Sequence, residues 1–99
     1  MKNPIGNLNK IFDHRIRLGI MSALMVNDSV DFITLRDLLQ VTDGNIATHL
    51  KQLEEHGAIR VTKEFIARKP RTSYSVTELG RDEFKQHLKA LEGILRNSR

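Results

Sequence analysis

The chain has 99 residues, of which 39% are hydrophobic and 28% are charged, and it contains no cysteine. This length and composition predict one small globular domain over residues 1–99. The lack of cysteine excludes disulfides, thiolate metal sites and cysteine nucleophiles. The first residues lead into no apolar segment typical of a signal peptide, and no apolar run approaches the roughly 18 residues of a membrane span. We therefore expect a cytoplasmic protein without membrane contact.

The net charge of +4 is concentrated in one segment. Residues 60–72 contain five basic residues and a single acidic one, whereas residues 1–59 contain six basic and seven acidic residues. Such a cluster is usually a solvated surface. A phosphate-binding element is the more specific interpretation, because neutralising phosphates and releasing counterions drives non-specific binding to nucleic acids.

The first part of the chain predicts short helical elements. Apolar residues at near-helical spacing indicate a short helix over residues 3–12, and a broad apolar surface over residues 14–25 indicates a helix at the centre of the core. Residues 31–33 fit a very short strand. Thr34, followed three residues later by Asp37, resembles a capping box that would open a helix reaching residue 41.

Residues 42–57 predict a helix with a cap at each end. Thr42 or Asp43 can accept hydrogen bonds from the first-turn amides, and Gly57 suits the left-handed position after the last turn. A buried stripe at positions i, i+4 and i+7 consists of Ile46, Leu50 and Leu53. The opposite face consists of Gly44, Asn45, Thr48, Lys51, Gln52 and Glu55. The first half of that face is short and uncharged, which suits an approach to base edges in a major groove; an ordinary amphipathic surface helix is the alternative.

After residue 57 the apolar period changes from 3.6 to 2. Ile59, Val61 and Phe65 alternate with polar residues, although Lys63 and Ile66 interrupt the pattern, and this predicts a strand with one buried face. Residues 67–71 interrupt it, with Pro70 at a turn or an edge, and residues 72–76 predict a second strand. Together they would form a hairpin with a basic tip. A last helix, capped by Thr77, follows the hairpin.

This order of elements predicts an α+β, mostly α, chain with a winged helix-turn-helix fold and a two-stranded basic wing. Two runs carry a resemblance to a family: THLKQLEEHGAI at residues 48–59 and YSVTELGR at residues 74–81. With the basic wing between them, they resemble winged helix-turn-helix transcriptional regulators of the ArsR and MarR type. They are most similar to the small stand-alone winged-helix DNA-binding domain repressors of archaea and bacteria. The resemblance covers nearly the whole chain.

The resemblance implies a sequence-specific double-stranded DNA-binding transcriptional regulator, expected to be a dimeric repressor. The helix over residues 43–56 would enter the major groove, and the wing over residues 60–76 would contact the backbone or the minor groove. The recognition residues would be Thr42, Gly44, Asn45, Thr48, His49, Lys51 and Gln52. The wing contacts would come from Lys63, Arg68, Lys69, Arg71 and Thr72. Asn45 could pair with adenine and Thr48 could contact a base or a thymine methyl group, whereas His49 would pack or contact a phosphate.

The resemblance also implies a homodimer, with the segments 1–12 and 77–99 at the interface and half-sites about one DNA turn apart. The interface residues would be Ile5, Leu8, Phe12, Phe84, Leu88, Leu91 and Leu95. The alternative is that the leucines of the last helix only cover the domain's own core.

Neither an enzyme nor a ligand-binding protein is expected. Asp82, Glu83 and His87 offer an oxygen–nitrogen metal site, because Glu83 and His87 are i, i+4 neighbours, but a solvated helix face is favoured. The histidines show no metal-ligand spacing and no catalytic constellation is present, so we expect no metal, cofactor or small-molecule ligand. A winged-helix protein-interaction module without DNA-binding activity is the alternative function, because a fold does not fix a function. The basic wing favours DNA.

Overall fold

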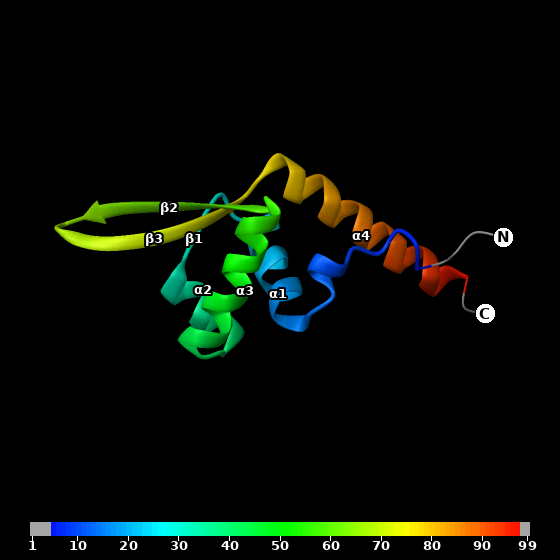
Figure 1. The fold of residues 1–99 in the computed structure, drawn as a ribbon, viewed down its shortest axis with the longest axis horizontal. Coiled ribbons are helices and arrows are strands. Elements are labelled where there is room, and N and C mark those ends of the chain that lie inside the picture. The colour runs from blue at the N-terminus through cyan, green and yellow to red at the C-terminus, as the bar shows by residue number, and fades with distance from the viewer. Residues whose placement is uncertain (1–4, 98–99) are drawn as a thin grey trace.

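A computed structural model of the chain describes residues 5–97 as a winged helix fold (Figure 1). The elements in chain order are η1 (Lys10–Phe12), α1 (Arg15–Met25), β1 (Val30–Asp31), α2 (Phe32–Leu39), α3 (Asp43–His56), β2 (Ile59–Ile66), β3 (Lys69–Val76) and α4 (Glu78–Arg96). The strands form an antiparallel sheet in the order β1-β3-β2. The mostly helical α+β class and the winged helix fold are confirmed. Within residues 5–97, no helix is long and apolar enough to cross a membrane.

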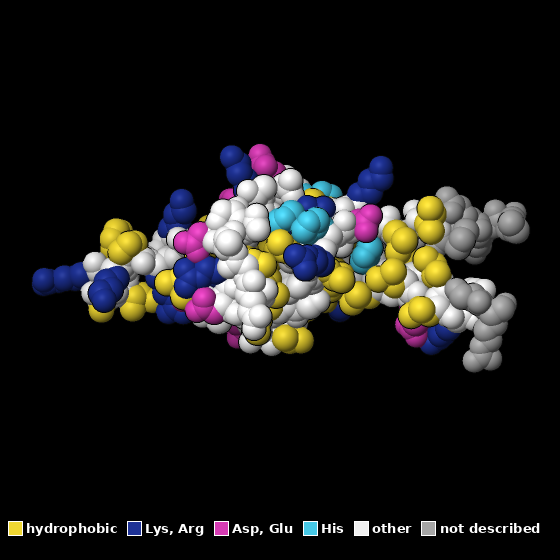
Figure 2. Space-filling model, turned by 90° about the horizontal axis from the view of Figure 1, so that it is seen from below, with side chains coloured by type: hydrophobic (Ala, Val, Ile, Leu, Met, Phe, Trp, Pro, Cys, Tyr) yellow, Lys and Arg dark blue, Asp and Glu magenta, His cyan; other side chains and the backbone are white. Residues whose placement is uncertain are grey.

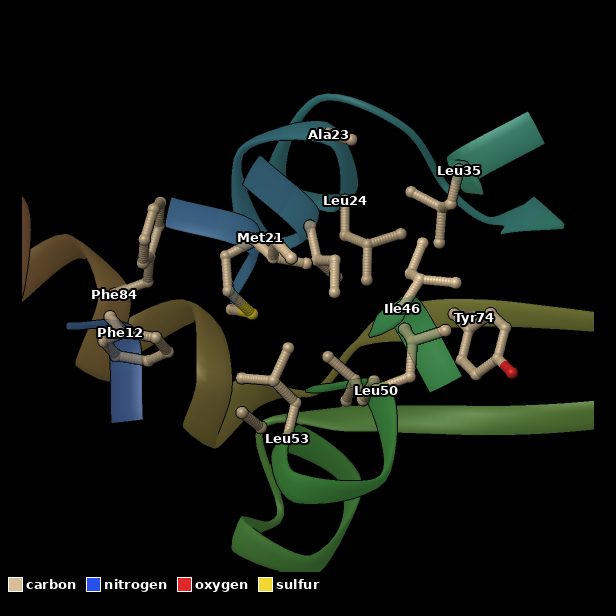
Figure 3. Close-up of a cluster of buried hydrophobic side chains, with 14 residues drawn as sticks. Phe12, Met21, Ala23, Leu24, Leu35, Ile46, Leu50, Leu53, Tyr74 and Phe84 are labelled. Carbon is tan, nitrogen blue, oxygen red and sulfur yellow. The ribbon is translucent and has the colours of Figure 1, made fainter. Parts of the chain in front are cut away.

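The hydrophobic core lies where α1, α2 and α3 meet the sheet and the first turns of α4 (Figure 3). Ile20 and Leu24 of α1 are completely buried, as are Leu35 of α2 and Ile46 and Leu53 of α3. Burying an aliphatic side chain of this size stabilises a fold by about 1.5–3 kcal/mol. The apolar stripe therefore holds α3 against α1 and the sheet, and the polar face of α3 is left to solvent.

Helix α2 begins three residues earlier than the capping box expected at Thr34. The N-cap is Asp31, whose Oδ1 accepts a hydrogen bond from the Thr34 amide at 3.1 Å. The strand expected over residues 31–33 is correspondingly displaced, because β1 is Val30–Asp31 and Phe32 is already helical. A carboxylate at a helix N-terminus also interacts favourably with the helix dipole, which a threonine hydroxyl does not. The choice of Asp31 over Thr34 corrects the sequence prediction.

The N-terminal segment is less helical than expected. Of the helix expected over residues 3–12, the structure shows the 3-10 turn η1, and residues 3 and 4 lie outside the described range. His14 is the N-cap of α1, and its Nδ1 accepts a hydrogen bond from the Ile16 amide at 3.1 Å. Helix α1 therefore begins at Arg15, close to the expected position.

The β2–β3 hairpin is longer than the sequence indicated. Strand β3 begins at Lys69 rather than at residue 72, and only Ala67 and Arg68 form the turn. Both have left-handed backbone angles (φ 51° and 67°), as the two-residue turns that match the twist of a hairpin require. Pro70 lies inside β3 at a level that β1 does not reach. Its missing amide therefore faces a free edge of the sheet.

The hairpin projects beyond the body of the domain (Figure 1). Ile59, at the base of β2, is buried as the alternation predicts, but Phe65 on the same face is 77% exposed. The expectation of one buried face along the whole strand is therefore wrong for the outer half of β2. There Lys63 and Ile66 interrupt the alternation, and the helices of the core no longer cover the strand.

Helix α4 is anchored to the end of α3 at its first turn. Its N-cap is Thr77, whose Oγ1 accepts a hydrogen bond from the Gly80 amide at 2.9 Å and donates one to the Gly57 carbonyl at 2.6 Å. A Cβ atom at Gly80 would lie 2.0 Å from the carbonyl oxygen of Ala58, so only glycine permits this approach. From that anchor α4 extends away from the wing (Figure 1).

Candidate nucleic-acid interface

The first turns of α3 form an exposed surface of small side chains. Thr42 caps the helix, and its Oγ1 accepts a hydrogen bond from the Asn45 amide at 3.2 Å. A Cβ atom placed at Gly44 would have no neighbouring atom within 4 Å, so the backbone there is open. The Thr48 hydroxyl donates to the Gly44 carbonyl at 3.0 Å, which leaves its methyl group and acceptor capacity for a ligand. This end of α3 can approach another surface closely.

Arg36 of α2 fixes the start of α3. Its Nη1 lies 3.0 Å from Asp43 Oδ1 in the first turn of α3, and its Nε lies 3.0 Å from Asp37 Oδ1. The carboxylate of Asp43, followed by that of Asp37, raises the pKa of Arg36. The pairing partly neutralises a carboxylate that would otherwise repel phosphates at the exposed end of α3.

The flank of α3 that faces α1 carries a cluster of rings and a guanidinium group. Arg17 Nη1 donates to His49 Nδ1 at 3.0 Å and to Gln52 Oε1 at 2.7 Å. The rings of His14 and His49 stack with centroids 4.1 Å apart. Burial first, and then the charges of His14 and Arg17, lower the pKa of His49, so its ring is neutral near pH 7.

Two of the expected recognition residues thus bond to a side chain of another helix. His49 and Gln52 are held by Arg17 of α1. His49 is half-buried, whereas Gln52, Asn45, Thr48 and Lys51 are exposed. Packing and phosphate contact were the two roles expected for His49, and its ring is packed against that of His14.

The wing carries its cations at its turn and along one hollow. Arg68 occupies the turn, and Lys63 and Lys69 line an open hollow of about 780 Å³ between the wing and the start of α2. Arg71, in the same hollow, has its Nε 4.0 Å from Asp31 Oδ2. Hydrogen bonds from Thr34, and more weakly the charge of Arg71, lower the pKa of Asp31. Of the expected wing contacts, Thr72 alone is not exposed but half-buried.

One face of the molecule combines these features (Figure 2). The view is from below Figure 1, towards the turn between α2 and α3. Lys and Arg side chains lie at the end of the wing, and histidine side chains gather in the middle of the face beside further Lys or Arg groups. The molecule measures 57 Å along its longest axis, so this face is long enough to follow a duplex over more than one groove.

The opposite end of the molecule holds the residues expected at a dimer interface, but not all of them are available. Phe12 and Phe84 are each 1% exposed and contact each other edge to face, with ring centroids 5.1 Å apart. The structure therefore places both in the core of the domain itself, which corrects their assignment to an interface. The exposed or half-buried members of the set are Ile5, Leu8, Leu88, Leu91 and Leu95.

The helix face with Glu83 and His87 is not the solvated face that was favoured. His87 is buried, and its Nδ1 accepts a hydrogen bond from the Asn9 amide at 3.0 Å. Glu83 Oε1 accepts from Asn9 Nδ2 at 2.9 Å and lies 2.7 Å from His56 Nε2. Both side chains hold the N-terminal segment and α3 against α4. Within residues 5–97, no group of three or more His, Asp or Glu side chains could hold a metal ion.

Sequence reasoning missed the residues that act across long separations. Arg17 reaches His49 over 32 positions and Asn9 reaches His87 over 78. No local spacing signals either contact. The ion pair of Arg36 with Asp43 is different, because the two residues are only seven positions apart. Their places on either side of a short turn between two helices could have suggested this pair.

These observations define a winged helix domain whose basic wing lies on the same side as the exposed start of α3, and the similarities to known proteins agree. Residues 16–95 match the winged helix DNA-binding domain family, to which the chain therefore belongs. The resemblance inferred from the sequence is confirmed.

Two archaeal relatives and one bacterial one illustrate the similarity. An uncharacterized protein of Methanocaldococcus jannaschii is 33% identical over 89% of this chain and 96% of its own length. A transcriptional regulator homologue from Pyrococcus horikoshii is 32% identical, with a TM-score of 0.83 over 89% of this chain and 87% of that chain. A MarR-family candidate regulator from Porphyromonas gingivalis shares the fold at 20% identity, with a TM-score of 0.70 over 89% and 85% of the two chains. The chain thus resembles transcriptional regulators.

Proposed function

We propose that this protein is a sequence-specific double-stranded DNA-binding transcriptional regulator, a homodimeric repressor acting in the cytoplasm. One observation carries the proposal: the first turns of α3, where Gly44, Asn45 and Thr48 are exposed and Arg36 pairs with the carboxylate of Asp43, lie on the same side of the molecule as the basic wing. Neutral polar side chains read base edges, whereas cations hold phosphates and fix the register. Duplex DNA is the ligand that needs both.

The first two turns of α3 would supply the specificity. The Asn45 carboxamide has the donor and acceptor needed to pair with adenine, and the Thr48 methyl group suits a thymine methyl. Gly44 adds no side chain between the helix and the groove. Lys51, further along the exposed face, would contact a phosphate at the groove edge.

The wing would supply affinity that is independent of sequence. Lys63, Arg68, Lys69 and Arg71 can neutralise phosphates, and each neutralised phosphate releases counterions. The exposed Phe65 adds an apolar contact for the sugar edges of the minor groove, where apolar side chains are often inserted. Such contacts hold the duplex against the start of α3.

The end of the molecule opposite the wing would form the dimer. Ile5, Leu88, Leu91 and Leu95 are exposed, and hydrophobic side chains gather around this end (Figure 2). The N-terminal segment lies beside α4, to which Asn9 ties it. A contiguous apolar surface of this kind usually marks an interface, and a twofold pair would present two recognition helices to two half-sites.

Repression would follow from occupancy. A dimer bound across two neighbouring grooves would cover DNA that a polymerase needs. Binding alone would therefore be enough for repression. An activator would need an additional surface for the polymerase, for which residues 5–97 offer no specific feature.

The test is fluorescence anisotropy of the protein on random-sequence duplex DNA over a salt series. Binding in the micromolar range that weakens steeply between about 50 and 200 mM salt is expected for several phosphate contacts. Selection from a random duplex pool would then identify the preferred site. No binding at low salt would overturn the DNA-binding proposal and leave the protein-interaction module as the function to pursue.

A further inference from the structure

The cluster on the α1 side of α3 consists of His14, Arg17, His49 and Gln52, and we propose that it is a second phosphate-binding site. It would hold the DNA backbone on the flank of α3 that faces away from the wing. The inference rests on the proposed function and extends it, because it assigns residues of α1 to DNA binding.

The hydrogen bonds inside the cluster fix which nitrogen of each ring is free. His14 Nδ1 accepts from the Ile16 amide, and His49 Nδ1 accepts from Arg17. A neutral imidazole that accepts at Nδ1 carries its proton on Nε2. Each ring therefore carries one N–H donor, at Nε2, and no free acceptor.

The guanidinium group of Arg17 is held in place and only partly used. Its Nε donates to the Ile11 carbonyl at 2.6 Å, and its Nη1 donates to His49 and Gln52. No residue among positions 5–97 takes the hydrogens of Nη2. Gln52 gives its oxygen to Arg17, so its own NH₂ group is also left as a donor. The polar groups of the cluster that these bonds leave unused are thus all donors, which is the requirement of an anion site.

The cluster lies where a duplex would need a second contact. At about 100° per residue, His49 and Gln52 border one side of the exposed face of α3, and Glu54 borders the other. Glu54 lies near Tyr74 of β3, whose pKa it raises in addition to the effect of burial. The wing and α1 lie on opposite sides of α3 (Figure 1), so the cluster, which Arg17 of α1 joins to α3, is on the flank of α3 that faces away from the wing. A helix in a major groove has phosphates on both sides.

The charges around the cluster are compatible with a phosphate. Arg17 is its permanent cation, and Lys10 lines the same open groove beside Gln52. Glu55 also lines this groove and Asp13 precedes His14 in the chain, so the site is less positive than the wing. It is therefore a positioning contact, which fixes how deeply α3 enters the groove, and adds less affinity than the wing.

Two variants test the site on random-sequence duplex DNA. Arg17→Gln removes the cation, and the slope of log K against log salt should fall by about one unit, with affinity reduced about tenfold. His14→Asn keeps an acceptor suited to the N-cap of α1 but removes the ring N–H, so affinity should fall about threefold with an unchanged thermal midpoint. Lys89→Gln, an exposed cation on α4, is the matched control and should change neither quantity.

A measurement on the wild-type protein distinguishes direct contact of the cluster with DNA from a purely structural role of its residues. Long-range ¹H–¹⁵N NMR spectra of the imidazoles should show the Nε2–H form for His14 and His49, and both signals should shift as duplex is added. The site would be overturned, and the proposed function left intact, if the wild type bound duplex while its imidazole signals did not shift and both variants kept the wild-type affinity and salt slope. A wild type that binds no duplex would overturn both. If Arg17→Gln unfolds, His14→Asn and the spectra decide.

Discussion

The Nε2 atom of His56 lies 2.7 Å from Oε1 of Glu83, a contact that joins the last turn of α3 to α4. The same carboxylate accepts a hydrogen bond from Asn9. One side chain thus links the recognition helix, the long terminal helix and the N-terminal segment. Because it lies between the surface proposed for DNA and the surface proposed for dimerisation, this contact would set the angle of α3 relative to the axis of the proposed dimer.

The wing should contribute affinity without specificity. Replacing Arg68, Lys69 and Arg71 together with alanine removes three exposed cations. Binding should weaken by a similar factor on every duplex, and the salt slope should become shallower by about 2 to 3 units. Anisotropy titrations on a selected site and on a scrambled one measure both effects. A triple variant with the affinity and slope of the wild type would remove the wing from the interface.

The start of α3 should contribute specificity. Asn45→Ala removes the only carboxamide in the first two turns of the helix and should reduce discrimination between the selected and scrambled sites by about 1–3 kcal/mol. The salt slope should stay unchanged, since no charge is lost. Gln86→Ala, which removes an exposed carboxamide from α4, is the matched control and should leave the discrimination unchanged. Equal loss of affinity on both duplexes would contradict base reading by Asn45.

Dimerisation should depend on the outer half of α4. Leu91→Glu places a charge in the exposed apolar surface, where burial without a partner is costly. Size-exclusion chromatography with light scattering should then report a folded monomer, and the affinity for a two-half-site duplex should fall. Val26→Glu alters an exposed apolar residue at the end of α1 and should leave the dimer intact. Persistence of the dimer in Leu91→Glu would remove this interface.

Features that depend on neighbouring residues could be predicted from the sequence, whereas features that depend on contacts between residues far apart in the chain could not. The recognition helix was bounded correctly because its caps, Thr42 and Gly57, lie beside it in the chain. The hairpin was predicted, but its turn was expected over residues 67–71 rather than at Ala67 and Arg68 alone, because these two adopt left-handed angles that glycine or asparagine usually supplies. The exposure of Phe65 depends on how far the β2–β3 hairpin projects beyond the helices of the core, and an alternation pattern does not indicate this.

The candidate site shows the same division. The exposed residues of α3 and the wing follow from periodicity and charge. The bonds from Arg17 to His49 and Gln52 depend on how α1 packs against α3. The burial of Phe12 and Phe84 depends on how η1 packs against α4. Both are tertiary facts that a single sequence pattern does not contain.

The first turn of α4 should tolerate no side chain at position 80. In Gly80→Ala the new Cβ would lie 2.0 Å from the Ala58 carbonyl oxygen, and backbone atoms cannot move aside as a flexible side chain can. Overpacking of this kind typically costs about 1–3 kcal/mol, which should lower the thermal midpoint by roughly 4–8 °C per kcal/mol in a domain of this size. Gly93→Ala, where a Cβ meets no atom within 4 Å, should be neutral or stabilising because alanine favours helices. Equal midpoints for the two variants would contradict the close approach.

The free energy of unfolding should fall as the pH drops below about 6.5. Burial, followed by repulsion from His14 and Arg17, lowers the pKa of His49, and burial lowers the pKa of His87 although the charge of Asp13 opposes it. The unfolded chain, with histidines near their ordinary pKa of 6.5, therefore binds more protons in this range. Stability from these rings is fully present above the unfolded pKa and is lost as the pH falls through the lower, folded values.

Thermal midpoints measured from about pH 8 to pH 5, at one protein concentration, test this dependence. The midpoint should be flat at the alkaline end and decline on the acidic side. The pKa of Asp31 is lowered from 3.8, so its contribution is lost at lower pH and does not overlap this range. His49→Gln retains an acceptor for Arg17 without a titrating ring, and its midpoint should vary less with pH than that of the wild type. A wild-type midpoint that stays constant down to about pH 5 would show that neither ring is held neutral by the fold.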